Sequence, residues 1–407
     1  MTKHAPEDEL AVKAPEGEKI VLLIFDGLGD IPHPDFGGKT PLEAAKTPNL
    51  DRLAKDGALG RIIPVAIGIT PGSGPAHLGL FGYDPLELEI GRGVLEALGI
   101  GVALNAQSLS ARANFATMDE KGIITDRRAG RIPTEKTIGI CKKLQENIGD
   151  FEGVKVEIFP AKEHRFVVVF RGEGLADGLS DADPHREGSP LPEVRATKAG
   201  AEKAARVINA FLKKAQGILA GESPANAILL RGLATPPTIP LFPERFKVKS
   251  AAIAVYPMYK GLARLVGMEI LKVNGETYED EFKTYIENYD KYDYFFIHIK
   301  GTDSAGEDGD FARKVKVIEE VDRILPILTA KMPAVLAVTG DHSTPALLKS
   351  HSWHPVPLLV CSKCVSRDST QRLTELEAVN GALGTFKSRH LMKILLSNAK
   401  RMDKYGA

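Results

Sequence analysis

Short, unbroken runs of apolar residues recur along the chain and predict the strands of a central sheet. The runs are rich in β-branched and aromatic residues, and they lack the alternation of a strand with one exposed face. This pattern is typical of strands that are buried on both faces, so we predict the α/β fold class, with a central, mostly parallel sheet flanked by helices. The runs cover residues 20–25, 250–257, 292–300, 334–338 and 356–360.

Helices are predicted where a capping residue precedes apolar residues at helical spacing. Thr40 and Thr47 are each followed by Pro, and Thr as N-cap with Pro at the first helical position favours a helix start. Residues 311–328 carry apolar side chains at helical spacing, and residues 388–402 predict a closing helix.

The pattern changes between residues 103 and 248, where short β-like runs alternate with Gly and Asp turns and many Arg residues. Within this region, residues 193–214 are predicted to form an amphipathic helix. We therefore predict an α+β domain at 103–248, inserted into a core formed by residues 19–102 and 249–407. Residues 1–18 lack an apolar segment and are predicted to be a disordered tail.

Composition and charge exclude several classes of function. The chain has 407 residues, of which 43% are hydrophobic and 26% are charged, as in an ordinary globular protein. Basic and acidic residues balance at 53 each, which argues against a general nucleic-acid or anionic-membrane binder. No apolar run approaches the roughly 20 residues that span a bilayer, and the N-terminus lacks the apolar core of a signal peptide. A cytoplasmic location is the expectation.

The chain has three cysteines, too few for a disulfide framework. Cys361 and Cys364 form a CxxC pattern, which is compatible with a redox pair or half of a zinc site. Because no second CxxC or thioredoxin-like context accompanies them, we interpret them as two reduced thiols at a strand end.

Acidic side chains stand at the ends of predicted strands. Asp26 follows the first run, Asp303 follows residues 292–300, and Asp341 follows residues 334–338. The carboxyl ends of parallel strands form the edge where open α/β sheets bind ligands. Asp26 as a simple turn cap is the alternative interpretation.

Histidines gather after the same edge. Three of the ten histidines of the chain fall within residues 342–354: His342, His351 and His354. A single His in a polar loop is usually a surface residue, but this concentration beside Asp341 favours a site for divalent metal.

Ser73 stands between Gly72 and Gly74, just before a predicted helix. The glycines leave its hydroxyl uncrowded, and a helix N-terminus attracts phosphate. A Gly-Ser-Gly segment alone is also typical of flexible loops, and no phosphate-binding GxxxxGK[ST] motif is present.

Longer motifs give a more specific indication. The motifs are FDGLGD at 25–30, GGKTPLEAAKTPNLDRLAKDG at 37–57, ITPGSGPAHLGLFGYDP at 69–85, GRGVLEALGIGV at 91–102, KGTDSAGEDGD at 300–310, TGDHSTP at 339–345 and SHSWHPVP at 350–357. In these motifs, taken in order from about Lys19 to the C-terminal helix, the chain resembles the archaeal-type 2,3-bisphosphoglycerate-independent phosphoglycerate mutases of the alkaline phosphatase superfamily. The resemblance implies an alkaline-phosphatase-like core with an inserted cap that handles the substrate.

The resemblance also implies two divalent cations, Mn²⁺ or Mg²⁺ with Zn²⁺ or Co²⁺ as further candidates, and a phosphoserine relay on Ser73. In this family pattern, one cation is held by Asp26, Ser73, Asp341 and His342, and the other by Asp303 and His351. His354 is then a neighbour and not a ligand. The expected partner is a small molecule, phosphoglycerate, with no nucleic acid and no membrane; an oligomer is compatible with the sequence.

Basic residues of the insertion are candidates for substrate binding because Arg pairs with carboxylate and phosphate through two hydrogen bonds. Most single Arg residues are simply solvated. Those whose surroundings resemble family segments, together with one Lys of the core, are Arg112, Arg128, Arg131, Arg165, Arg231 and Lys260.

One position departs from the family pattern. Many members carry His four residues after the Asp of the TD motif, whereas Glu307 stands there in this chain. We predict that Glu307 is a metal ligand, and a carboxylate would favour harder ions. The alternative is that it lies off the metal.

Two other functions remain open at this point. One is a related metal-dependent phosphatase or homoserine-kinase-like phosphotransferase on the same scaffold. The other is a binding protein that has lost activity, which the retained Ser73 and ligand set argue against.

Overall fold

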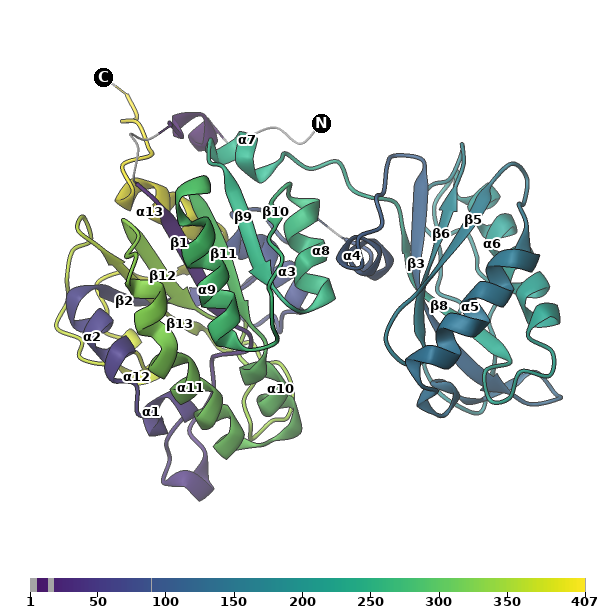
Figure 1. The fold of residues 1–407 in the computed structure, drawn as a ribbon, viewed down its shortest axis with the longest axis horizontal. Helices are drawn as coiled ribbons and strands as arrows, with labels where there is room; N and C mark the ends of the chain where they lie inside the picture. Colours follow the sequence, from purple (N-terminus) through teal and green to yellow (C-terminus); the bar gives the residue numbers. More distant parts are fainter. Residues whose placement is uncertain (1–5, 14–17, 89, 407) are drawn as a thin grey trace. The chain divides into compact units, whose positions relative to one another are not determined.

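The computed structural model describes residues 6–13, 18–88 and 90–406. The chain divides into two compact units (Figure 1). The core unit comprises Met1–Glu89 and Ile239–Ala407, and the inserted unit comprises Ile90–Thr238. Within the described residues, no helix is both long and apolar enough to cross a membrane.

The core unit contains an eight-stranded sheet in the order β10-β9-β11-β1-β12-β13-β2-β14. Neighbouring strands are parallel except in the two pairs that involve β13. The predicted α/β class with a mostly parallel sheet is thereby confirmed. The strands are β1 Ile20–Phe25, β2 Ala58–Ile63, β9 Ser250–Ala254, β10 Glu269–Ile270, β11 Tyr294–Ile299, β12 Val335–Thr339, β13 Val356–Ser362 and β14 Gly384–Lys387.

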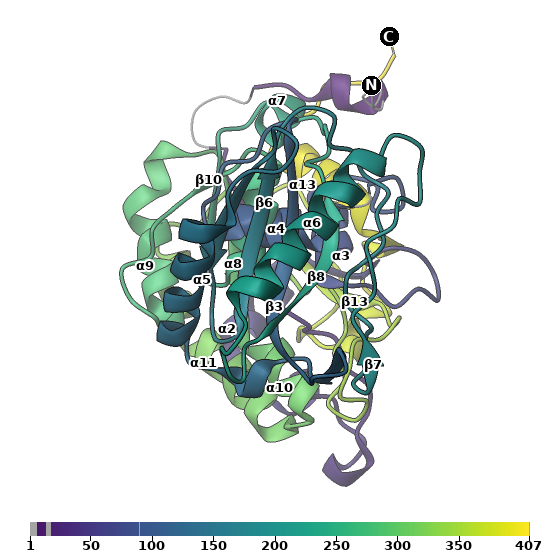
Figure 2. The same cartoon turned by 90° about the vertical axis from the view of Figure 1, so that its right-hand side faces the viewer.

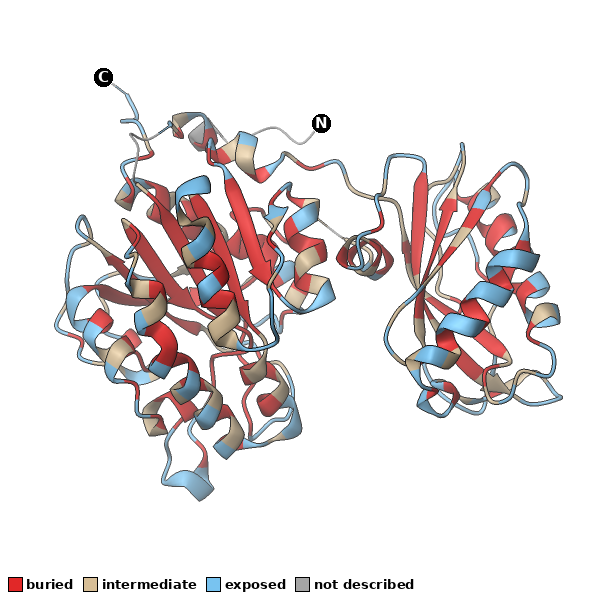
Figure 3. Ribbon diagram, viewed as in Figure 1, coloured by how far each residue is buried: buried red, intermediate tan, exposed pale blue. Residues whose placement is uncertain are grey.

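The central strands of this sheet have no exposed position. Every residue of β1, β9, β11 and β12 is buried (Figure 3). Strands covered on both faces have no polar face, which explains the unbroken apolar runs. The helices of the core unit are α1 Pro41–Ala44, α2 Pro48–Asp56, α3 Ser73–Leu80, α7 Phe242–Phe246, α8 Pro257–Leu265, α9 Tyr278–Asn288, α10 Gly301–Asp308, α11 Phe311–Thr329, α12 Glu375–Ala378 and α13 Leu391–Asn398.

The inserted unit is built on an antiparallel sheet in the order β5-β6-β3-β4-β7, with β8 also paired to β3. Helices α5 and α6 lie in front of this sheet in Figure 2 and share a buried apolar cluster with it. The elements are α4 Arg92–Gly99, β3 Ser108–Met118, β4 Ile123–Asp126, α5 Thr134–Ile148, β5 Lys155–Pro160, β6 Arg165–Arg171, β7 Ser189–Pro190, α6 Glu202–Ile218 and β8 Ala227–Ala234.

The structure places the insertion at 90–238, whereas the sequence predicted 103–248. The two ranges differ at the start because α4 belongs to the inserted unit, where it packs on β3 and β8. A Cβ on Gly93 would lie 2.4 Å from the carbonyl oxygen of Ser110, so this glycine permits the close approach of helix and strand. At the other end, the Tyr83 hydroxyl donates to the carbonyl oxygen of Pro240 at 2.7 Å, within the core unit.

Three local predictions also differ from the structure. The amphipathic helix begins at Glu202 and not at residue 193, after Gly200 with a φ of 91°. The closing helix spans only Leu391–Asn398. In the predicted disordered tail, residues 6–10 form a 3-10 helix whose Asp8 is held by Arg245 at 2.6 Å; residues 1–5 and 14–17 lie outside the described part of the chain.

Candidate active site

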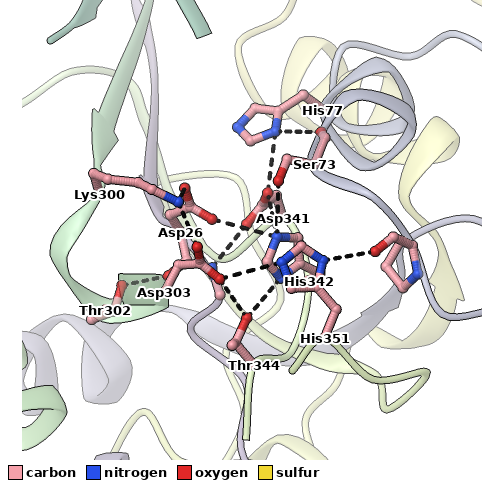
Figure 4. A network of polar contacts seen from close by, with 12 residues as sticks. Asp26, Ser73, His77, Lys300, Thr302, Asp303, Asp341, His342, Thr344 and His351 are labelled. Carbon is pink, nitrogen blue, oxygen red and sulfur yellow. Dashed lines mark hydrogen bonds and ion pairs between the residues drawn. The ribbon is translucent and has the colours of Figure 1, made fainter. Parts of the chain in front are cut away.

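Polar residues from three adjacent strand ends meet at one edge of the core sheet. Asp26 follows β1, Asp303 lies in the first turn of α10 after β11, and Asp341 follows β12 (Figure 4). All three are buried, at 0 to 1% exposure. The pairing of β1 with both β11 and β12 brings these residues together, as the sequence pattern predicted.

One group of candidate ligands consists of Asp26, Asp341 and His342. The Nε2 atom of His342 lies 3.4 Å from Asp26 Oδ1 and 3.2 Å from Asp341 Oδ2. Neither carboxylate oxygen has a hydrogen-bond partner among the described residues. Two buried carboxylate oxygens without a hydrogen-bond partner, beside an imidazole nitrogen, form a donor set that fits a divalent cation.

His342 can offer a lone pair to such a cation. Burial lowers the pKa of His342, although the charges of Asp341 and Asp26 act in the opposite direction. The neutral imidazole is the form that binds metals.

The second group consists of Asp303, His342 and His351. His351 Nε2 lies 3.5 Å from Asp303 Oδ1. Burial alone would raise the pKa of Asp303, but the hydrogen bond with His351 and the charge of Lys300 hold it well below its usual range. Burial alone would lower the pKa of His351, but its hydrogen bond with Asp303 raises that pKa to about 9.

Glu307 lies at the margin of this second group. Its Oε1 atom is 3.9 Å from His351 Nε2, and its side chain is 55% exposed. Ligation by Glu307 stays a prediction.

His354 lies outside both ligand groups. Its Nδ1 atom contacts Ser352 Oγ at 3.0 Å, and its ring stacks on Trp353.

Ser73 is the first residue of α3, and Gly72 is the N-cap. Its Oγ atom lies 3.3 Å from His342 Nε2, on the side of the first ligand group. One turn later, His77 Nδ1 contacts the Ser73 carbonyl oxygen at 2.9 Å and lies 3.3 Å from Asp341 Oδ2. The hydroxyl therefore stands beside the candidate cation site and at a helix N-terminus, which suits an anionic group.

Lys300 connects the two ligand groups. Its Nζ atom lies 3.0 Å from Asp26 Oδ2 and donates a 2.5 Å hydrogen bond to Asp303 Oδ2. Burial acts to lower the pKa of Lys300, but the charges of Asp26 and Asp303 outweigh it and raise the pKa. The Tyr259 hydroxyl also donates to Asp26 Oδ2.

Three of the predicted substrate residues, Arg112, Arg165 and Arg231, surround one carboxylate of the inserted unit. Arg112 Nη1 pairs with Glu96 Oε1 at 3.2 Å, and the charges of Arg165 and Arg231 also act on Glu96. Burial raises the pKa of Glu96, and these cations oppose the increase. Arg231 Nε also lies 3.5 Å from the buried Asp183 Oδ2, so a second carboxylate accompanies these three cations.

The other predicted substrate residues are Arg128, Arg131 and Lys260. Arg128 is exposed in the turn after β4, and Arg131 has a φ of 51° in the same turn. Lys260 lies on α8 of the core unit, where burial and the charge of Arg264 lower its pKa. The roles of all six residues stay predictions.

Comparisons with known proteins relate these features to a family. The model for 2,3-bisphosphoglycerate-independent phosphoglycerate mutase matches residues 54–226. A curated relative from Thermotoga sp. (strain RQ2), named as a probable member of that group, is 53% identical over 96% of both chains. The chain belongs to this family. A relative of the same name from Aquifex aeolicus (strain VF5) is 51% identical over 96% of this chain and 97% of its own.

Solved structures agree with this membership. A protein from Pyrococcus horikoshii aligns with a TM-score of 0.82 and 34% identity, over 96% of this chain and 100% of that one. The cofactor-independent phosphoglycerate mutase from Thermoplasma acidophilum aligns with a TM-score of 0.73 and 33% identity, over 94% of this chain and 100% of that one. The predicted enzyme class, an isomerase, is confirmed.

The sequence interpretation gave no role to four polar residues of this phosphoglycerate mutase site. Lys300 ends the run at 292–300, and His77 follows Ser73 by one helical turn, so their positions in the motifs carried a signal. Thr344 follows His342 by two residues in the TGDHSTP motif, so it carried such a signal as well. Tyr259 comes from another segment, and no spacing in the sequence relates it to the ligands.

Proposed function

We propose that this chain interconverts 3-phosphoglycerate and 2-phosphoglycerate through a phosphoserine on Ser73, without 2,3-bisphosphoglycerate. The observation that carries the proposal is the position of Ser73 Oγ, 3.3 Å from His342 Nε2 in a buried carboxylate–histidine group. Family membership supports the substrate, because the relatives are named for this reaction.

Two cation sites are part of the proposal. Asp26, Ser73, Asp341 and His342 would hold one divalent ion, and Asp303 and His351, with Glu307 at the margin, the other. Bound ions would lower the pKa of the Ser73 hydroxyl and offset the negative charge of a transferring phosphoryl group. Carboxylate-rich donor sets suit Mn²⁺ or Mg²⁺.

Ser73 and Lys300 have separate parts in the proposed reaction. Ser73 Oγ forms a bond to phosphorus while the bond from phosphorus to the 3-oxygen of glycerate breaks, and the 2-hydroxyl of glycerate later takes the phosphoryl group back. Protons balance over the cycle, because each oxygen that loses the phosphoryl group gains a proton. Lys300 presents an ammonium beside Asp26 and Asp303, where it can bind a phosphoryl oxygen.

The arginine cluster of the inserted unit is proposed to bind the anionic substrate. Arg112, Arg165 and Arg231 carry three positive charges, and the carboxylates beside them are Glu96 and Asp183. The Nε atoms of Arg112 and Arg165 are buried without a hydrogen-bond partner among the described residues. Retaining glycerate while excluding water is what distinguishes a mutase from a phosphatase.

The proposed function is tested with purified protein, 3-phosphoglycerate and Mn²⁺ or Mg²⁺, with 2,3-bisphosphoglycerate left out. We expect 2-phosphoglycerate to form, and a chelator to abolish its formation until the ion is restored. The products are followed by phosphorus NMR. Release of free phosphate without the isomer would instead indicate a phosphatase.

A further inference from the structure

The hydroxyl of Thr344 lies between the two ligand groups. Its Oγ1 atom is 2.7 Å from Asp303 Oδ1 and 3.0 Å from His342 Nδ1 (Figure 4). Thr344 is fully buried. Thr344 belongs to neither ligand group, but its hydroxyl contacts one residue of each group.

The protons of these two hydrogen bonds can be assigned from chemistry alone. The Asp303 carboxylate only accepts, so the single proton of the Thr344 hydroxyl goes to it. The contact with His342 then requires the proton of Nδ1–H, which the hydroxyl oxygen accepts. This tautomer leaves the lone pair of His342 on Nε2, the atom that faces the first ligand group.

The backbone of Thr344 is held in place by a buried ammonium. Lys314, on α11, is fully buried, and its Nζ atom donates to the Thr344 carbonyl oxygen at 2.9 Å. The same atom donates to Gly29 O at 3.2 Å and Asp30 Oδ2 at 2.8 Å. The Thr344 amide donates to Gly29 O at 3.0 Å. The loops after β1 and β12 are thus clamped together at this residue.

Neighbouring glycines leave room for Thr344. A Cβ on Gly27 would lie 2.4 Å from Thr344 Oγ1, and a Cβ on Gly306 would lie 2.2 Å from its carbonyl oxygen. The loop after β1 and helix α10 therefore approach Thr344 more closely than side chains would allow.

We propose that Thr344 is a positioning residue that couples the two cation sites, because its hydroxyl sets the tautomer of His342 and orients Asp303. The inference rests on the proposed function in one respect, that cations bind these groups. Hydrogen-bond partners of metal ligands orient them, and losing such a partner typically weakens metal affinity by about 10- to 100-fold.

The test is Mn²⁺ binding to the metal-free full-length protein, measured by titration calorimetry and by the signal of free Mn²⁺ in electron paramagnetic resonance. Thr344→Val keeps the shape and removes the hydroxyl, and we expect it to bind Mn²⁺ at least about tenfold more weakly. Thr344→Ser keeps the hydroxyl and is expected to stay within about threefold of the unsubstituted protein. Thermal melting of the metal-free proteins measures any loss of stability separately.

Thr339→Val is the matched control. Thr339 is the last residue of β12 and is fully buried like Thr344, but its hydroxyl donates to Pro357 O at 2.8 Å and not to a ligand. Its Mn²⁺ affinity should be unchanged. Wild-type affinity in Thr344→Val, or equal losses in Thr344→Val and Thr344→Ser, would overturn the inference. Two bound Mn²⁺ without mutase activity would instead count against the proposed function alone.

Discussion

Replacing Ser73 by alanine is expected to lower mutase turnover by roughly 10⁴- to 10⁶-fold, the range seen when a catalytic nucleophile is removed. Without Oγ, no covalent carrier for the phosphoryl group remains. The ligand groups around Asp26 and Asp303 are otherwise intact, so Mn²⁺ binding should fall far less than activity. Steady-state rates and Mn²⁺ titration of the same preparation measure the two effects.

Ser350→Ala is the control for this substitution. Ser350 is an exposed serine in the loop that leads to His351, and its hydroxyl bonds only to the Leu348 carbonyl oxygen among the described residues. Turnover should be unchanged. If Ser73→Ala kept more than about a hundredth of the activity, the phosphoryl group would have to transfer without this serine.

Replacing Asp341 by asparagine is expected to remove the first cation and to lower turnover by at least about 10³-fold. Asp341 is fully buried, and each tenfold loss of rate corresponds to about 1.4 kcal/mol of lost transition-state stabilisation. Asparagine keeps the shape and can still accept the 2.9 Å hydrogen bond from Gly27 N. The loss would therefore reflect charge and ligation, which metal analysis of the purified variant measures directly.

The matched control is Asp310→Asn. Asp310 caps α11, where its carboxylate accepts from Arg313 N at 2.9 Å, and asparagine caps a helix equally well. Activity and metal content should be those of the unsubstituted protein. Full metal content in Asp341→Asn would contradict the assignment of Asp341 as a ligand.

The apolar runs predicted the central strands correctly because these strands are buried on both faces. From the strands follow the positions of Asp26 and Asp341, since residues after adjacent parallel strands meet at one edge. Asp303 was also predicted at this edge, but the structure places it in the first turn of a helix. The local sequence was therefore sufficient to predict the position of those site residues that follow the ends of strands.

Contacts between distant segments could not be predicted in the same way. Tyr259 reaches Asp26 from α8, and Lys314 reaches Thr344 from α11. Neither contact leaves a periodic pattern, because each depends on how a helix packs against the sheet. The start of the inserted unit was misplaced for the same reason, since α4 resembles a core helix until its packing on β3 is known.

The central claim is that Ser73 carries the phosphoryl group during turnover, and the most direct test is to look for it there. The protein is mixed with 3-phosphoglycerate and Mn²⁺, quenched in acid within milliseconds, digested with trypsin and analysed by mass spectrometry. The peptide from Ile62 to Arg92 contains Ser73 as its only serine. We expect this peptide to gain one phosphoryl group during turnover and to lose it once substrate and product are removed. Rapid turnover to 2-phosphoglycerate with an unmodified peptide at every quench time would contradict the account.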